Sequence, residues 1–235
     1  GIMITDETKK ITDFEEKPAK PRSTLASMGI YIFSWKKLRQ YLIDNENNPE
    51  EDKDFGKAII PNMLNAGEKL VAYPFEGYWR DVGTIDSLWE ANMDLLNPNI
   101  PLDLYDPDWK IYSRTANMPP QYVGSSAKIE NSMISEGAVV NGNVDFSIIF
   151  PGVTIEEGAT VRDSIIMPGS VIKAGAVVEY AIVGEECVVG EYATIGARPE
   201  SVTDKDSWGV AVIGHNLTVS EGKKIAPKEN VTENV

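Results

Sequence analysis

The sequence predicts a mixed α/β part followed by an all-β parallel β-helix, and three observations support this fold class. Strand-like and helix-like stretches alternate up to residue 96. Five prolines and little periodicity then mark a connector. After it the sequence repeats with a period of 17 residues. The predicted parts are 1–96 (α/β), 97–122 (connector), 123–220 (β-helix) and 221–235, a polar tail that we expect to be mobile.

The repeats are the most regular feature of the sequence. Three segments, residues 147–163, 164–180 and 181–197, align without gaps, and their glycines recur where corners are expected. A short strand cannot bury one aliphatic side chain alone, whereas three strands per turn, stacked in coils, bury continuous columns. A β-sandwich with accidental register is the alternative. The predicted columns are Ile149, Ile166 and Val183; Ile155, Ile172 and Val189; and Val161, Val178 and Ile195.

The first part combines predicted strands and helices. Apolar patterning predicts strands over residues 2–4, 11–15, 27–33 and 70–75, the first two as a hairpin. Three polar residues precede stretches of helical periodicity and are predicted N-caps: Ser34, Asp54 and Thr84. Pro61 should interrupt the second helix, and Gly67 suits its end.

Composition excludes several classes of function. The chain has 235 residues, 42% of them hydrophobic, and a formal net charge of −14. Such an acidic surface repels nucleic acids and anionic lipids, so neither a nucleic-acid partner nor membrane docking is expected. One cysteine, Cys187, excludes an intramolecular disulfide and fits a cytoplasmic location. No apolar run approaches a membrane span, and no signal peptide opens the chain.

The start of the chain is unusual. Gly1 is not a natural initiator, and residues 1–6 read like a strand that enters a turn. We therefore expect a fragment whose N-terminal half is missing.

Three motifs in the first part carry candidate chemistry: FEEKP (14–18), ASMGIY (26–31) and GYWRDVGT (77–84). Lys17 offers a compact cation for a phosphate, and Glu16 offers acceptors for sugar hydroxyls. Asp81 is either a hard oxygen ligand for Mg²⁺ or a residue that caps the following helix. Each motif alone also has a plain structural explanation, as solvated charges, an ordinary strand serine in Ser27, or core aromatic residues.

Taken together, the motifs resemble those of bacterial glucose-1-phosphate adenylyltransferases. FEEKP, ASMGIY and YWRDVGT occur in this order before a hexapeptide β-helix, and the likeness includes DFGK at 54–57 and WKIY at 109–112. The resemblance implies an α/β nucleotidyltransferase (Rossmann-like) partial domain, a left-handed sense for the β-helix, and a tetramer of identical or homologous subunits.

The resemblance also implies a reaction and its residues. ATP and α-glucose 1-phosphate would give ADP-glucose and diphosphate, as in glycogen biosynthesis, with Mg²⁺ offsetting charge. The implied catalytic residues are Lys17, which grips the sugar phosphate, and Asp81, the metal ligand. The implied glucose 1-phosphate pocket contains Gly1, Glu16, Lys17, Ser27, Tyr78 and Trp79.

One motif of that family is absent from the chain. Its glycine-rich nucleotide loop, G-G-x-G-T-R-L, occurs nowhere here, so we expect no cofactor-binding residues for the nucleotide and no adenylyltransferase activity from these 235 residues alone. Because Glu16, Lys17, Ser27 and Asp81 are all present, the sequence favours the catalytic type over a non-catalytic regulatory subunit.

Two rival enzyme classes stay open. A nucleotidyltransferase for another base or sugar is compatible with these residues. A hexapeptide-repeat acyltransferase would need a histidine base, and the single histidine, His215, lies beyond the clearest repeats.

Overall fold

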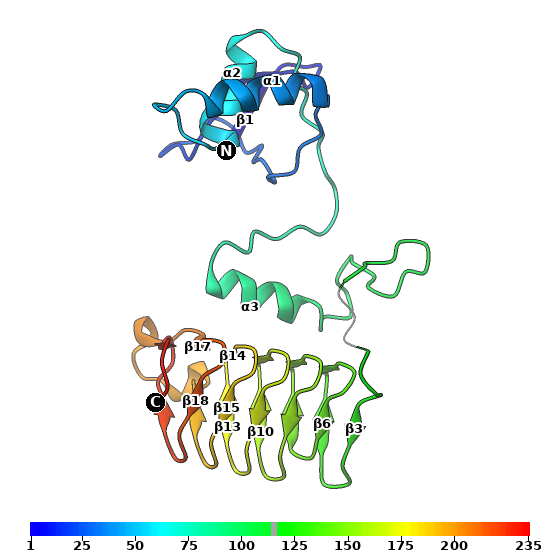
Figure 1. Ribbon diagram of the computed structural model, residues 1–235, viewed down its shortest axis with the longest axis vertical. Helices are drawn as coiled ribbons and strands as arrows, with labels where there is room; N and C mark the ends of the chain where they lie inside the picture. Colours follow the sequence, from blue (N-terminus) through cyan, green and yellow to red (C-terminus); the bar gives the residue numbers. More distant parts are fainter. Residues whose placement is uncertain (114–116) are drawn as a thin grey trace. The chain divides into compact units, whose positions relative to one another are not determined.

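The computed structural model describes residues 1–113 and 117–235, which form two compact units, Gly1–Trp79 and Arg80–Val235 (Figure 1). The division falls before the third predicted helix, whereas the change in composition falls near residue 97. The reason is that this helix, α3 (Ile85–Asp94), packs within the second unit. No helix in the described part of the chain is long and apolar enough to cross a membrane.

The second unit is a parallel β-solenoid of the left-handed β-helix type, as the repeats and the resemblance predicted. Its described strands form three six-stranded parallel sheets. One sheet contains β3 (Tyr122–Val123), β6 (Val139–Val140), β9 (Thr154–Ile155), β12 (Val171–Ile172), β15 (Val188–Val189) and β18 (Thr218–Val219). The second contains β4 (Lys128–Glu130), β7 (Asn143–Asp145), β10 (Thr160–Arg162), β13 (Val177–Glu179), β16 (Thr194–Ile195) and β19 (Lys224–Ile225). The third contains β5 (Met133–Ile134), β8 (Ile148–Ile149), β11 (Ile165–Ile166), β14 (Ala181–Val183), β17 (Ala211–Ile213) and β20 (Asn230–Val231).

The three predicted columns are confirmed by the strand register. Ile166 pairs with Ile149 on one side and Val183 on the other, and the other two columns pair in the same way. Every member of the three columns is at most 1% exposed. The β-sandwich alternative is therefore wrong, because each strand pairs in parallel with the strand one coil away.

Glycine is required at the corners for two different reasons. Gly169 has φ +72°, a conformation that L side chains rarely adopt. At Gly184, a Cβ atom would lie 2.8 Å from the backbone carbonyl carbon of Gly214 in the next coil. Both reasons were expected from the repeat.

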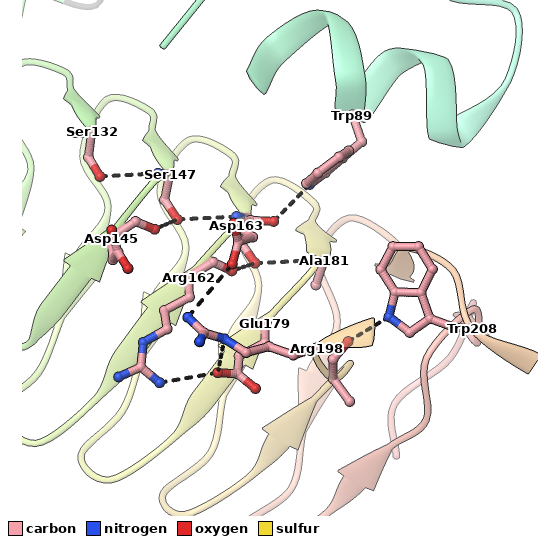
Figure 2. Close-up of polar contacts among 12 residues, drawn as sticks. Trp89, Ser132, Asp145, Ser147, Arg162, Asp163, Glu179, Ala181, Arg198 and Trp208 are labelled. Carbon is pink, nitrogen blue, oxygen red and sulfur yellow. Dashed lines mark hydrogen bonds and ion pairs between the residues drawn. The ribbon is translucent and has the colours of Figure 1, made fainter. Parts of the chain in front are cut away.

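A ladder of serine side chains connects successive coils beside one corner (Figure 2). The hydroxyl of Ser164 donates to the carbonyl oxygen of Arg162 at 2.6 Å and accepts from the N–H of Ala181 at 3.1 Å. Ser147 makes the same two contacts one coil earlier, and its N–H donates to the hydroxyl of Ser132. Both Ser147 and Ser164 are fully buried, so the ladder satisfies polar groups that water does not reach.

The expectation of a mobile tail over residues 221–235 is corrected by the structure. These residues contain β19 and β20, whose Ile225 and Val231 are 2% and 5% exposed and extend two of the aliphatic columns. The 17-residue period did not extend to the strands of these later coils, because an insertion breaks it between β16 and β17. It contains the short 3₁₀ helices η2 (Pro199–Ser201) and η3 (Lys205–Ser207).

The first unit begins with the predicted hairpin, β1 (Ile2–Thr5) and β2 (Ile11–Glu15), paired antiparallel. Helix α1 (Trp35–Glu46) follows Ser34, which occupies the N-cap position without a side-chain capping bond. Asp54 caps the π-helix η1 (Phe55–Ile59), accepting from the N–H groups of Gly56 and Lys57. Pro61 lies in the first turn of α2 (Ile60–Asn65), so it starts this helix instead of interrupting one. Gly67 ends it with φ +74°.

Two predicted strands of the first unit are wrong. Residues 27–33 and 70–75 form no ladder, and Gly29 bends the first stretch with φ +73°. Isolated bridges join Ala26, just before the first stretch, to Ile2, and Val71, within the second, to Lys10. Alternation predicts which faces a strand would have, but a strand also needs a hydrogen-bonding partner. Ile30 and Ile32 are accordingly 71% and 100% exposed.

Candidate functional site

Glu16 follows the end of β2 and is half-buried in the first unit. Its Oε2 atom lies 3.3 Å from the amino nitrogen of Gly1. The same oxygen lies against the first turn of η1, where a Cβ atom added to Gly56 would approach it to 2.6 Å. A glycine at position 56 therefore makes room for the Glu16 carboxylate.

Ser27 lies beside the same residues. Its N–H donates to the carbonyl oxygen of Gly1 at 2.8 Å, next to the bridge between Ile2 and Ala26. The Ser27 hydroxyl lies 3.0 Å from the hydroxyl of Tyr31 and accepts from the N–H of Gly29 at 3.2 Å. Gly1 thus contacts both Glu16 of the first motif and Ser27 of the second.

Lys17 occupies an exposed bend directly after Glu16. Its φ is +47°, which is uncommon for a residue with a side chain and is often found at functional sites. Among the residues that the structure describes, its ammonium group makes neither a hydrogen bond nor an ion pair. The charge is therefore available to an anion.

Arg22 is a charged neighbour that the sequence did not single out. Its guanidinium forms ion pairs with Asp13 and Glu15, two acidic residues of β2. Hydrogen bonds from Arg22 lower the pKa of Asp13, and the same bonds raise the pKa of Arg22. These contacts neutralise acidic groups that lie just before Glu16 and Lys17. Arg22 also borders a hollow of about 560 Å³ next to β1, which no predicted site residue lines.

The third motif spans the boundary between the two units. Trp79, 41% exposed, and the half-buried Tyr78 end the first unit, so neither is a fully buried core residue. Asp81 is exposed at the start of the second unit, and its Oδ1 accepts from the N–H of Gly83 at 2.9 Å. Asp81 does not cap α3, because Thr84 does so with a capping box. The convergence of Asp81 with Lys17 stays a prediction.

The described residues contain no cluster of three or more histidine, cysteine or acidic side chains that would hold a metal ion. Asp81 alone offers one carboxylate. His215, the residue on which an acyltransferase would depend, lies exposed in a turn after β17.

One supporting residue was missed by the sequence analysis. Gly56 controls the space beside Glu16, and the only signal for it was its position two residues after a predicted N-cap aspartate, in the DFGK segment.

Two family models match the chain, one over its mixed α/β part and one over its repeats. Residues 1–98 match the family described as "Nucleotidyl transferase", and residues 115–219 match "GlmU-like, C-terminal hexapeptide". Residues 115–219 are therefore similar to hexapeptide-repeat solenoids, and residues 1–98 are similar to the nucleotidyltransferase class of enzymes. Enzymes of this class generally use divalent metal ions.

The curated relatives compared with this chain share one name. Proteins named glucose-1-phosphate adenylyltransferase from Bacillus thuringiensis (strain Al Hakam) and Bacillus anthracis are each 58% identical over 158 residues, and one from Bacillus mycoides (strain KBAB4) is 57% identical. The aligned stretch covers 67% of this chain and 42% of each relative, so the chain matches less than half the length of these proteins. The resemblance drawn from the motifs is confirmed.

Proposed function

We propose that this chain is the sugar-phosphate side and the solenoid of a glucose-1-phosphate adenylyltransferase. The reaction joins ATP and α-D-glucose 1-phosphate to give ADP-glucose and diphosphate, a step of glycogen biosynthesis. The observation that carries the proposal is the grouping of Gly1, Glu16 and Ser27, with Lys17 unpaired beside them, at the motifs that resemble the sugar-phosphate site. The names of the relatives support the same reaction.

The proposed reaction is an in-line displacement. An oxygen of the sugar phosphate attacks the α-phosphorus of ATP, a new P–O bond forms, and the bond to the leaving diphosphate breaks. Lys17 holds the phosphate of glucose 1-phosphate by its charge, while Glu16 accepts hydrogen bonds from glucose hydroxyls. Ser27 and the backbone at Gly1 line the pocket, and Tyr78 and Trp79 form its wall. Catalysis by these residues rests on positioning and electrostatics.

Asp81 is the proposed ligand for Mg²⁺. Its Oδ1 is occupied by the Gly83 N–H, whereas its Oδ2 accepts no hydrogen bond within the described chain, so one hard oxygen is available. A bound ion would offset phosphate charge during the transfer. One carboxylate does not complete a coordination sphere, so the remaining ligands come from the substrates, water or protein outside this chain.

Binding of glucose 1-phosphate tests the proposed site. In a titration followed by NMR, we expect shifts at the amides of Glu16, Lys17 and Ser27. Replacing Lys17 by Met removes the charged phosphate contact and should weaken binding about tenfold or more. Lys20→Met, a matched change at an exposed lysine three residues away, should leave the affinity unchanged. Equal affinities for Lys17→Met and the parent chain would contradict the assignment.

A separate assay tests the need for a nucleotide loop. Because the chain contains no glycine-rich phosphate loop, the purified 235 residues should form no radiolabelled ADP-glucose from ATP and glucose 1-phosphate. Robust turnover would show that the nucleotide is bound by other residues.

The assembled enzyme is proposed to be a cytoplasmic tetramer of identical or homologous subunits. A regulatory subunit or an enzyme for a different nucleotide sugar would share this fold. The NMR titration addresses the first alternative, since a degenerate subunit need not retain the phosphate contact of Lys17. An acyltransferase is less well supported, and His215→Ala combined with an acetyl-transfer assay tests it.

A further inference from the structure

Helix α3 is docked on the outside of the solenoid. Met93, in its last turn, and Leu96, two residues beyond its end, are 5% and 7% exposed. They pack with an outer column of isoleucines and with one residue of the insertion: Ile148, Ile165, Ile182 and Val210. The isoleucines of this column come from three successive coils. Although α3 lies within the stretch that matches the nucleotidyltransferase family, its apolar contacts are therefore with the repeats.

Trp89 connects the middle of α3 to one corner of the solenoid (Figure 2). Its indole N–H donates to the backbone carbonyl oxygen of Asp163 at 2.7 Å. The centroid of its ring lies 5.4 Å from the ring centroid of Tyr180. The ring centroids of Tyr180 and Trp208 lie 5.1 Å apart. Asp163 and Tyr180 occupy equivalent corners, with φ of +47° and +48°. The hydrogen bond and the aromatic contacts together fix the rotation of α3 about its axis.

Ion pairs connect the residues before α3 to the same helix. Arg80 forms an ion pair with Asp94 at 2.6 Å and lies 3.6 Å from Glu90, so the chain folds back along α3. Between Arg80 and the helix, Asp81 accepts from the N–H of Gly83, and Thr84 caps the first turn. Asp81 is therefore connected to the solenoid through a short, hydrogen-bonded segment.

We propose that the solenoid positions Asp81, and that Trp89 is a positioning residue that transmits this constraint through α3. The role of Asp81 as a metal ligand rests on the proposed function, but its placement by the solenoid does not. In the assembled enzyme, any event that shifts the Trp89 corner would move the carboxylate. The solenoid would then affect the nucleotidyl transfer without contacting either substrate.

Distance measurements between two spin labels test this proposal on the chain as it is. One label is placed at Val82, next to Asp81, and the other at Glu157, an exposed turn residue of the solenoid. Both positions are changed to cysteine. The native Cys187 does not compete for the label, because its thiol is buried and burial raises its pKa.

Trp89→Ala should broaden the distribution of distances between the labels about twofold, because the segment before α3 is released into local opening motions. Trp109→Ala is the matched control, since Trp109 is 81% exposed in the connector, and it should leave the distribution unchanged. An unchanged distribution in Trp89→Ala would overturn the proposal.

Circular dichroism shows whether the variants retain the solenoid. If Trp89→Ala does not fold, Trp89→Phe decides the question, because it keeps most of the ring contacts and removes only the hydrogen bond to Asp163. A broader distribution in Trp89→Phe than in Trp109→Ala supports the proposal, and equal widths overturn it. Because no substrate or metal is used, failure of this test is distinguishable from failure of the proposed function.

Discussion

At the scale of single residues, the interior of the solenoid depends on aliphatic side chains that touch the coils above and below. Ile166 is fully buried between Ile149 and Val183. Replacing it by Ala should destabilise the solenoid by about 2–5 kcal/mol, because transfer energy is lost and a cavity remains. Chemical denaturation followed by circular dichroism measures this. Ile111→Ala, at a position that is 64% exposed in the same unit, should have little effect. Similar losses in both variants would argue against the packed column.

Asp163 makes stability depend on pH. Burial raises the pKa of its carboxyl above the ordinary value of 3.8, with Asp145 and Glu179 adding to the rise and Arg198 and Arg162 opposing it. A raised pKa in the folded state means that the folded chain holds the proton more tightly, so stability is lost as pH rises through the folded pKa.

Asp163→Asn should therefore raise the melting temperature at pH 7 and have a smaller effect in acid, below the ordinary pKa of the carboxyl. Asn also tolerates the positive φ of this corner. Glu157→Gln removes an exposed carboxyl of the solenoid in the same way and is the matched control. A difference between Asp163→Asn and the parent chain that is independent of pH would contradict this explanation.

At the scale of elements, the C-terminal strands complete the core. Val231 of β20 pairs with Ile213 and is 5% exposed, whereas the neighbouring Thr232 is exposed. Val231→Asp buries a carboxylate without a partner and should clearly lower the unfolding midpoint, while Thr232→Asp should not. If the last residues were a mobile tail, the two variants would behave alike in thermal unfolding.

The sequence predicted those elements whose signal is local. The aliphatic columns were readable because each coil repeats the pattern of the one before it, and the helix starts at Asp54 and Thr84 were readable from capping residues. The column positions beyond Ile195 were not predicted because the insertion shifted the period, and the strands after residue 220 were missed. The strands expected over 27–33 and 70–75 were wrong because strand formation depends on a distant partner that a single-chain pattern does not show.

The candidate site was also predictable from the sequence only in part. The motifs and the resemblance identified Gly1, Glu16 and Ser27, of which Gly1 contacts the other two in the first unit. They did not identify Gly56, whose importance lies only in the space that it leaves for Glu16. That relation joins residues 40 positions apart, and no local pattern reports it.

At the scale of the whole chain, the two units differ in how much core they possess. The second unit buries continuous columns, while the first exposes several large apolar side chains, including Ile32 and Tyr73. We expect the first unit to unfold and to be digested first. Limited trypsin digestion followed by mass spectrometry should give a stable fragment that still contains α3, because α3 is packed on the repeats. A stable fragment that begins after residue 97 would show that α3 is not part of the solenoid unit.

The serine ladder and the parallel register have a consequence for how such a protein changes length. The coils over residues 147–197 pair with their neighbours in one register, so one 17-residue copy gained or lost there would leave the remaining strand pairs intact. Each such event would shift everything beyond it by about one strand spacing, ~4.8 Å. The number of coils therefore sets the distance between the two ends of the solenoid.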